Sequence, residues 1–353
     1  MKTKTVMIYP DNKQEQAIHN YSEDLLKHTK TDSLTYTRGK PFTFPFFKAL
    51  KYKTIHIQHE YNLLGWYGLP FFILLPLLWL FGRRLILTMH TVLSPVDVNV
   101  GILRTFFYIA ANIIIGLTKT KIIVHSEAFK NILVCDYFFN EKSIVVIRHG
   151  VKEVPKFDRE KIKKELGLKG NVILLIGTFH KDHQPHLVIY QADKIDGEIF
   201  IVWNSDKGWK FNVYYDKCYK YAKENWLTKN ISSLDLAETY HDHQEWWWEF
   251  FYAADVVALP YVDGIGSGIF QDAMATRTPV VCSNTDYFRE MLGYNGGENP
   301  KDACGEIAIF DHDFPRAIKY AIKHQVKLRK GCDAYANKYS VKNMAKKTLR
   351  VYR

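Results

Sequence analysis

The fold of this 353-residue chain is decided by one stretch of sequence, AADVVALPYVDGIGSGIFQDAMATRTPVVCSNTDYFREM (Ala253 to Met291). It starts with an apolar, β-branched run that ends at Pro260, which is typical of a buried parallel strand. Three glycines surround Ser267, and a helical segment follows them directly. Pro279 closes that segment, and the apolar run VVCS comes next. The order predicts a strand, a glycine-rich loop, a helix and a second strand.

The glycine-rich loop, DGIGSG (263–268), has the chemistry of an anion-binding turn. Glycine lets backbone N–H groups approach a ligand closely, and the N-terminus of a helix adds the positive end of a dipole. A plain strand-to-helix turn is the alternative. Four backbone amides are the candidates for binding phosphate groups: those of Gly266, Ser267, Gly268 and Ile269.

Strand-like and helix-like segments alternate along the whole chain, which predicts parallel sheets with right-handed crossovers. The expected strands are KTVMIYP, TIHIQH, RLILTMH, KIIVHS and SIVVIRH, followed by NVILLIG, EIFIVWN, NISSLD, DVVALP, PVVCSN and EIAIF. A charged stretch with Pro155 separates the two sets. We therefore expect domains at 1–155 and 156–335, with a basic, amphipathic helix at 336–353.

Several motifs share their order and spacing with a known family. They are TIHIQHEYNLLG (Thr54 to Gly65), RRLILTMHTVLS (Arg83 to Ser94), VILLIGTFHKDHQPHLVI (Val172 to Ile189) and the stretch Ala253 to Met291. Together they resemble the GT-B glycosyltransferases, in particular glycosyltransferase family 4. The resemblance implies two Rossmann-like, doubly wound domains facing a central cleft. It gives the first domain the acceptor and the second the nucleotide sugar, and it packs the final helix back on the first domain.

The same resemblance implies a reaction. A retaining transferase of this kind moves a sugar from a nucleotide-diphosphate sugar to a hydroxyl acceptor, here a glycan or a lipid-linked acceptor. The departing phosphate and the incoming hydroxyl share one face of the sugar. No metal or other cofactor is expected, because a helix dipole and a basic loop can replace the cation.

The family resemblance also assigns roles to donor-side residues. Asp272 matches the second carboxylate of the family's Glu-x7-Glu pair, which holds the ribose hydroxyls, whereas the first carboxylate falls at Gly264 and is absent. Tyr240 is expected to flank the base. A helix-surface role is the alternative for Asp272.

The basic loop departs from the family pattern. Where the family has an Arg and a Lys on the diphosphate, this chain has His180 and His183, with Lys181 between them. Histidine has a reference pKa of ~6.5 and is only partly cationic at neutral pH. The alternative is a solvated loop without a ligand.

Three residues are expected at the ends of first-domain strands. His90, in LTMHT, corresponds to the family's histidine that faces the cleft, and it is the candidate catalytic residue. His59 and Glu60 follow the strand IHIQ and are expected on the acceptor side.

Charge is distributed unevenly. The net charge is +11, of which residues 1–150 contribute 18 − 10 = +8 and the remainder 30 − 27 = +3. The basic first domain suggests an anionic partner, either a membrane surface or a polyanion. A generally basic, solvated surface is the alternative. Five cysteines without metal spacing and an N-terminus that runs directly into a strand favour a cytoplasmic protein. The basic first domain and the apolar run from Tyr61 to Gly82 suggest a peripheral location on the inner face of a membrane.

One apolar stretch raises the question of a membrane span. Tyr61 to Gly82 has no charged residue and approaches the ~20 residues that a spanning helix needs. Pro70 and Pro76 interrupt it, and it lies between two strands of one sheet. It is therefore expected to be a buried or surface-facing helix.

Two other functions are compatible with the sequence. The missing Glu, Arg and Lys favour a degenerate GT-B protein that binds a sugar nucleotide or a partner without turnover. The positive charge instead allows a transferase that glycosylates nucleic acid, which steeply salt-dependent DNA binding would reveal.

Overall fold

The chain forms two compact units in this computed structural model. The structure describes residues 5–11, 16–61, 63–65, 68–95, 102–177, 181–203, 209–236, 246–262, 266–294 and 300–353. The first unit comprises Met1–Gly150 and Val341–Arg353, and the second comprises Val151–Ser340. The boundaries expected from sequence were 155 and 335.

A parallel sheet forms the centre of the first unit. Its strands are β1 (Thr5–Pro10), β2 (Asp32–Tyr36), β3 (Thr54–His59), β4 (Arg84–Met89), β5 (Lys121–Val124) and β6 (Ile144–Val146). Among the described residues their order is β2-β1-β3-β4-β5-β6, and all pairs are parallel. The strand order reverses between β1 and β3, as in flavodoxin-like folds.

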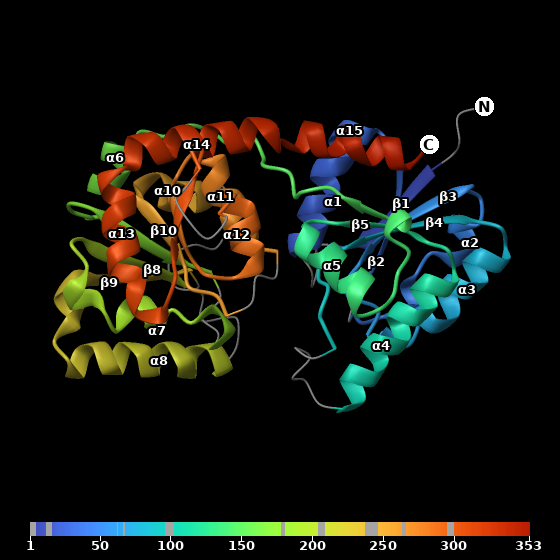
Figure 1. The fold of residues 1–353 in the computed structure, drawn as a ribbon, viewed down its shortest axis with the longest axis horizontal. Coiled ribbons are helices and arrows are strands. Elements are labelled where there is room, and N and C mark those ends of the chain that lie inside the picture. Colours follow the sequence, from blue (N-terminus) through green and yellow to red (C-terminus); the bar gives the residue numbers. More distant parts are fainter. Residues whose placement is uncertain are drawn as a thin grey trace. The chain divides into compact units, whose positions relative to one another are not determined.

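Helices cover both faces of this sheet (Figure 1). One face packs on α3 (Phe71–Leu80), α4 (Ile102–Leu117) and α5 (Glu127–Cys135). The other packs on α1 (Gln16–Thr29) and α15 (Val341–Val351). Successive residues of β1 alternate between these two cores, as the period of two in a strand requires.

The second unit is also a doubly wound sheet. Its strands are β7 (Val172–Ile176), β8 (Glu198–Trp203), β9 (Ile231–Asp235), β10 (Val256–Leu259), β11 (Val280–Ser283) and β12 (Gly305–Ala308). Within the part of the chain that the structure describes, the order is β9-β8-β7-β10-β11-β12, and all pairs are parallel. This is the strand order of dinucleotide-binding folds.

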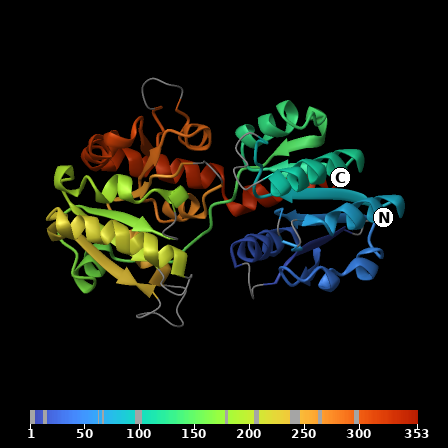
Figure 2. The same ribbon diagram turned by 90° about the horizontal axis from the view of Figure 1, so that it is seen from below.

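Both faces of the second sheet are covered as well (Figure 2). One core contains residues of α6 (Arg159–Glu165), α10 (Trp246–Ala253), α11 (Gly268–Ala275), α12 (Asp286–Leu292) and α14 (Gln325–Lys338). The other contains residues of α7 (His186–Ile189), α8 (Trp209–Glu224) and α13 (Phe314–Lys323). The aromatic run WWWEFF (246–251) lies in α10, with Phe250 and Phe251 buried.

Two local features differ from the sequence-based expectation. The strand β2 was not expected, because DSLTY is polar and forms a largely exposed edge of the sheet. The basic C-terminal segment is two helices: α14 ends at Lys338, and the amide of Val151 bonds to the carbonyl of Tyr339 at 2.8 Å before α15 begins.

The apolar stretch Tyr61 to Gly82 contains a short helix. The 10-residue α3 begins after Pro70 and buries Phe71, Leu75 and Leu78. None of the helices in the described parts of the chain combines the length and the apolar character that crossing a membrane requires.

Candidate functional site

The second sheet brings the glycine-rich loop and the basic loop to the same place. Ligands of open α/β sheets bind beyond the carboxyl ends of the strands, at the point where the strand order reverses. In this sheet that point lies between β7 and β10, which are direct neighbours. The basic loop follows β7, and the glycine-rich loop follows β10.

Gly177 is the residue at which β7 approaches the glycine-rich loop. Its φ is +117°, and a Cβ built on it would lie 3.7 Å from Cδ1 of Ile269. A larger residue would be strained at this φ whatever space it had. The end of β7 therefore lies directly against the first turn of α11.

The start of α11 presents unpaired backbone amides. Ser267 is the N-cap, and its Oγ accepts from the amide of Phe270 at 3.2 Å, while its own amide donates to the Tyr287 hydroxyl at 3.3 Å. The amides of Gly268 and Ile269 have no partner among the described residues. A Cβ on Gly268 would meet nothing within 4 Å. Two N–H groups and open space thus lie at the positive end of a helix.

The basic loop is fixed against the end of β10. It forms a single 3₁₀ turn, Lys181–His183, and the Asp182 carbonyl accepts from the amide of Val262 at 2.9 Å. The His183 ring stacks on Tyr261, with 4.3 Å between ring centroids. His183 is thereby held at the carboxyl end of β10.

Asp272 lies one turn into α11 and already has one partner. Its Oδ2 accepts from the indole N–H of Trp247, in α10, at 2.9 Å. The carboxylate is partly exposed. Trp247 therefore orients Asp272, which is a role that the sequence did not indicate. His180, Tyr240 and Gly264 lie outside the described residues.

The carboxyl edge of the first sheet carries a row of histidines. His59 ends β3, His90 and His125 directly follow β4 and β5, and His149 comes shortly after β6. The rings of His90 and His125 lie 5.2 Å apart, and those of His125 and His149 lie 5.7 Å apart. Tyr21, from α1, contacts the last three, with ring centroids 4.8 to 5.4 Å away.

These histidines are not arranged as a metal centre. Among the described residues, no group of three or more His, Cys, Asp or Glu side chains could hold a metal ion.

His90 is a neutral imidazole with a defined tautomer. Its Nε2 lies 2.9 Å from Oε1 of Gln58, an oxygen that can only accept, so the proton is on Nε2. Burial lowers the pKa of His90 well below its ordinary value, and the charges of His125 and His149 would lower it further. Nδ1 is left as an acceptor for a hydroxyl group.

The other two first-unit candidates differ in exposure. His59 is only 1% exposed, and its ring contacts Phe71 edge-on with centroids 4.5 Å apart. As placed, it contacts aromatic rings and not an open surface. Glu60, directly after β3, is partly exposed.

Two members of the histidine row were missed by sequence reasoning, His125 and His149. The signal was present, because KIIVHS and VVIRHG each place a histidine just after an apolar run, as LTMH does. Parallel strands align their carboxyl ends, so histidines that follow neighbouring strands meet at one edge.

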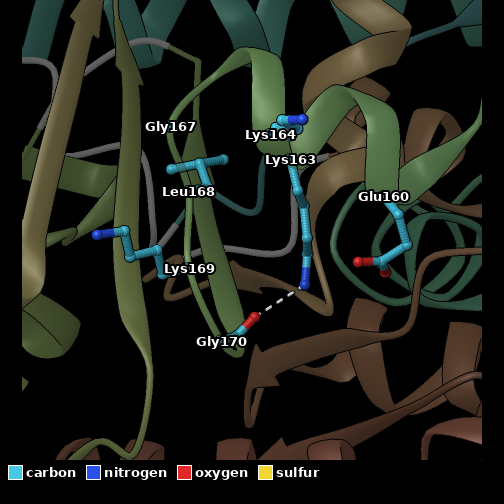
Figure 3. A pocket seen from close by; sticks show the side chains of 7 residues that line it. All are labelled: Glu160, Lys163, Lys164, Gly167, Leu168, Lys169 and Gly170. Carbon is cyan, nitrogen blue, oxygen red and sulfur yellow. Dashed lines mark hydrogen bonds between the residues drawn. The ribbon is translucent and has the colours of Figure 1, made fainter.

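A groove of about 530 Å³ lies elsewhere in the second unit (Figure 3). Its lining comes from α6 and from the approach to β7: Glu160, Lys163, Lys164, Gly167, Leu168, Lys169 and Gly170. Lys163 is engaged by the fold, with Nζ 2.8 Å from both the Gly170 carbonyl and Asp255. Gly170 precedes β7, so the groove is at the amino-terminal edge of the sheet, away from the glycine-rich loop.

The fold is the GT-B fold. Over 99% of both chains, this protein matches HepE of Anabaena in complex with UDP, with a TM-score of 0.73 at 13% identity. It also matches a glycosyltransferase of Rickettsia africae over 100% of this chain and 98% of that one (TM-score 0.73, 14% identity). Sucrose-phosphate synthase of Thermosynechococcus elongatus matches over 99% and 98% (TM-score 0.72, 15% identity). No family model and no curated protein matches the sequence.

Proposed function

We propose that this chain is a glycosyltransferase that binds a nucleotide-diphosphate sugar at the carboxyl edge of the second sheet and transfers the sugar to a hydroxyl acceptor. The observation that carries the proposal is the first turn of α11, where the amides of Gly268 and Ile269 have no partner among the described residues and Gly268 has open space beside it. A diphosphate is the ligand that such a helix N-terminus suits best. HepE, which has the same fold, forms complexes with UDP and with UDP-glucose.

The reaction needs electrostatic help at the leaving group more than covalent chemistry. As the glycosidic C–O bond breaks, negative charge grows on the departing diphosphate, and fixed donors stabilise it without reorganising. We assign that role to the two α11 amides, to Lys181 and to His183. Asp272 would hold the ribose hydroxyls, and Tyr240 would flank the base.

Transfer is proposed to proceed with retention, without a metal. The acceptor hydroxyl attacks from the face that the diphosphate leaves, and a phosphate oxygen takes its proton. His90, with Nδ1 as an acceptor, would position a sugar hydroxyl. The acceptor classes that we propose are glycans and lipid-linked sugars, on the acceptor side at the end of β3, where Glu60 is partly exposed and His59 is buried beneath the surface. The protein would then work in the cytoplasm, at the inner face of a membrane.

The test is thermal unfolding with UDP-, GDP- and ADP-sugars, followed by an assay for donor hydrolysis. A ligand present at about 100 times its Kd stabilises the native state by roughly 2.7 kcal/mol, so one base should raise the unfolding temperature by several degrees. Binding without turnover would favour a degenerate protein that binds the sugar nucleotide but does not transfer the sugar. Two features would explain such a loss of activity: the first carboxylate of the family's pair is absent, and Asp272 is already bonded to Trp247. No stabilisation by any nucleotide sugar would contradict the proposal.

A contact between the histidines and the diphosphate would link donor binding to protons. The diphosphate should raise the pKa of His180 and His183, so the complex takes up protons and affinity falls as pH rises through the histidine range. A shift of one pKa unit makes the affinity about tenfold higher at low pH than at high pH. Calorimetry with a UDP-sugar in two buffers of different ionisation heat measures the uptake.

The matched variant is His180→Arg with His183→Lys, which restores permanent charges and should flatten the pH dependence. If the wild type takes up no protons near pH 7 and the variant keeps the same pH profile, the histidines do not touch the phosphates. Lys181 and the α11 amides would then hold the donor alone.

A further inference from the structure

The surface of the first unit has an apolar face that the donor site does not use. In α3, Phe71, Leu75 and Leu78 form the buried stripe that a surface helix normally has. Ile73, Leu77 and Leu80 repeat the same spacing on the opposite side, where they are 63%, 37% and 71% exposed. The solvent-facing side of a surface helix is usually polar, whereas α3 is apolar on both sides.

Neighbouring elements extend this face. Three α4 side chains are strongly exposed, namely Phe106 (61%), Ile113 (54%) and Leu117 (69%). The helices α3 and α4 lie next to each other (Figure 1). The rings of Phe72 in α3 and Phe107 in α4 lie 6.1 Å apart.

The short helix α2 (Phe46–Ala49) adds another part. Phe46 contacts Phe81, just after α3, at 6.2 Å, and it also contacts Phe47. Phe47 is 83% exposed, and Phe81 is 55% exposed. We call these surfaces of α2, α3 and α4 the α3–α4 apolar face.

The part of the sequence that contains this face is strongly basic. Residues 38–126, which contain all three helices, hold ten Lys and Arg against two acidic residues, Glu60 and Asp97. The rest of residues 1–150 holds eight of each, so the whole +8 of that region lies in this segment. Three of the cations, Lys48, Lys51 and Lys53, are exposed on or just after α2.

We infer that the α3–α4 apolar face docks on the surface of an anionic lipid bilayer. Exposed apolar side chains bordered by cations are the combination that binds peripheral proteins to such membranes, and Trp79, 41% exposed on α3, suits the interfacial zone. The 10 residues of α3 rise only about 15 Å, half the ~30 Å hydrocarbon core, so the helix lies on the bilayer. A protein partner would not require this excess of positive charge.

The inference supplies the membrane partner of the proposed function, and its test is independent of the donor site. Flotation with phosphatidylcholine vesicles containing roughly one-third phosphatidylglycerol should recover the full chain, and pure phosphatidylcholine should recover much less. Raising the salt from about 0.1 M to ~1 M should weaken the binding, because it screens the charges.

Two sets of variants separate the apolar and the charged parts. Ile73→Glu with Leu80→Glu should weaken vesicle binding at least about tenfold, whereas Val326→Glu, at a 74% exposed apolar position on α14, should not. Changing Lys48, Lys51 and Lys53 to Gln should weaken binding to the anionic vesicles.

The matched charge control changes the exposed Lys217, Lys220 and Lys223 of α8 to Gln, and it should leave flotation unchanged. Absence of flotation, or equal loss in the control variants, would overturn the inference. So would a concentration-dependent dimer in sedimentation that the Ile73 and Leu80 changes dissociate without any vesicle binding, since a second copy would then cover the face. Nucleotide-sugar binding would be untouched by either result.

Discussion

Gly268→Val should abolish donor binding while leaving the fold intact. Gly268 is the first residue of α11, its φ is not in the left-handed region, and a Cβ would meet nothing within 4 Å, so valine fits the free protein. In the proposed complex the diphosphate fills that space, and an isopropyl group would hold it away from the Gly268 and Ile269 amides. We expect at least about a hundredfold loss of affinity, or roughly 2.8 kcal/mol.

Two comparisons make this experiment specific. Gly116→Val, in α4 of the first unit, introduces the same side chain at a helical glycine and should leave donor affinity unchanged. Ser267→Ala should cost about 1 kcal/mol of stability, because it removes the N-cap bond to Phe270, but should weaken the donor little. Wild-type affinity in a folded Gly268→Val protein would show that the diphosphate does not approach α11.

The strands were largely predictable from the sequence because parallel strands buried on both faces are continuous apolar runs. TIHIQH becomes β3 with all six residues buried, and VVAL becomes β10 in the same way. The exception is β2, whose polar DSLTY lies at the sheet edge and gives no such signal. The break between α14 and α15 was missed because the backbone bond from Val151 to Tyr339 is a long-range contact.

Site residues were predictable only where they are neighbours in the sequence. Ser267 directly precedes the helical segment in the sequence, and in the structure it is the N-cap of α11. The Trp247–Asp272 bond and the stacking of His183 on Tyr261 join elements that are 25 and 78 residues apart in sequence, so no local pattern contains them. The burial of His59 is also a tertiary effect, produced by Phe71 after the intervening loop.

The first unit should lose most of its stability between pH 7 and pH 5. Burial lowers the pKa of His56 and His59 to about 3 and that of His125 to about 4, and each side chain is at most 3% exposed. In the unfolded chain these groups titrate near ~6.5, so between pH 6.5 and 4 the unfolded state binds more protons than the folded state. Stability therefore rises with pH in this window and falls as the pH drops through it.

The three histidines together make this effect large. At pH 5 each histidine lowers the free energy of unfolding by about 2 kcal/mol, and all three together lower it by roughly 6 kcal/mol. This loss is comparable to the whole free energy of unfolding of an ordinary domain. Urea unfolding at several pH values, followed by amide exchange in the strands of the first sheet, measures the loss in that unit. At pH 7.5 the three groups are neutral in both states and should contribute no such dependence.

The variant His59→Phe measures the contribution of one of the three histidines to this pH dependence. Both ring nitrogens of His59 are buried without a partner among the described residues, and the ring already packs against Phe71, so phenylalanine removes titration without breaking a hydrogen bond. The variant should recover about 2 kcal/mol of the stability lost at pH 5 and should be at least as stable as the wild type at pH 7.5. His56 is a poor choice for the same test, because its ring nitrogens lie 2.7 Å from the hydroxyls of Tyr352 and Thr88. An unchanged pH dependence in His59→Phe would mean that His59 takes up its proton in the folded protein, and hence that water reaches the end of β3.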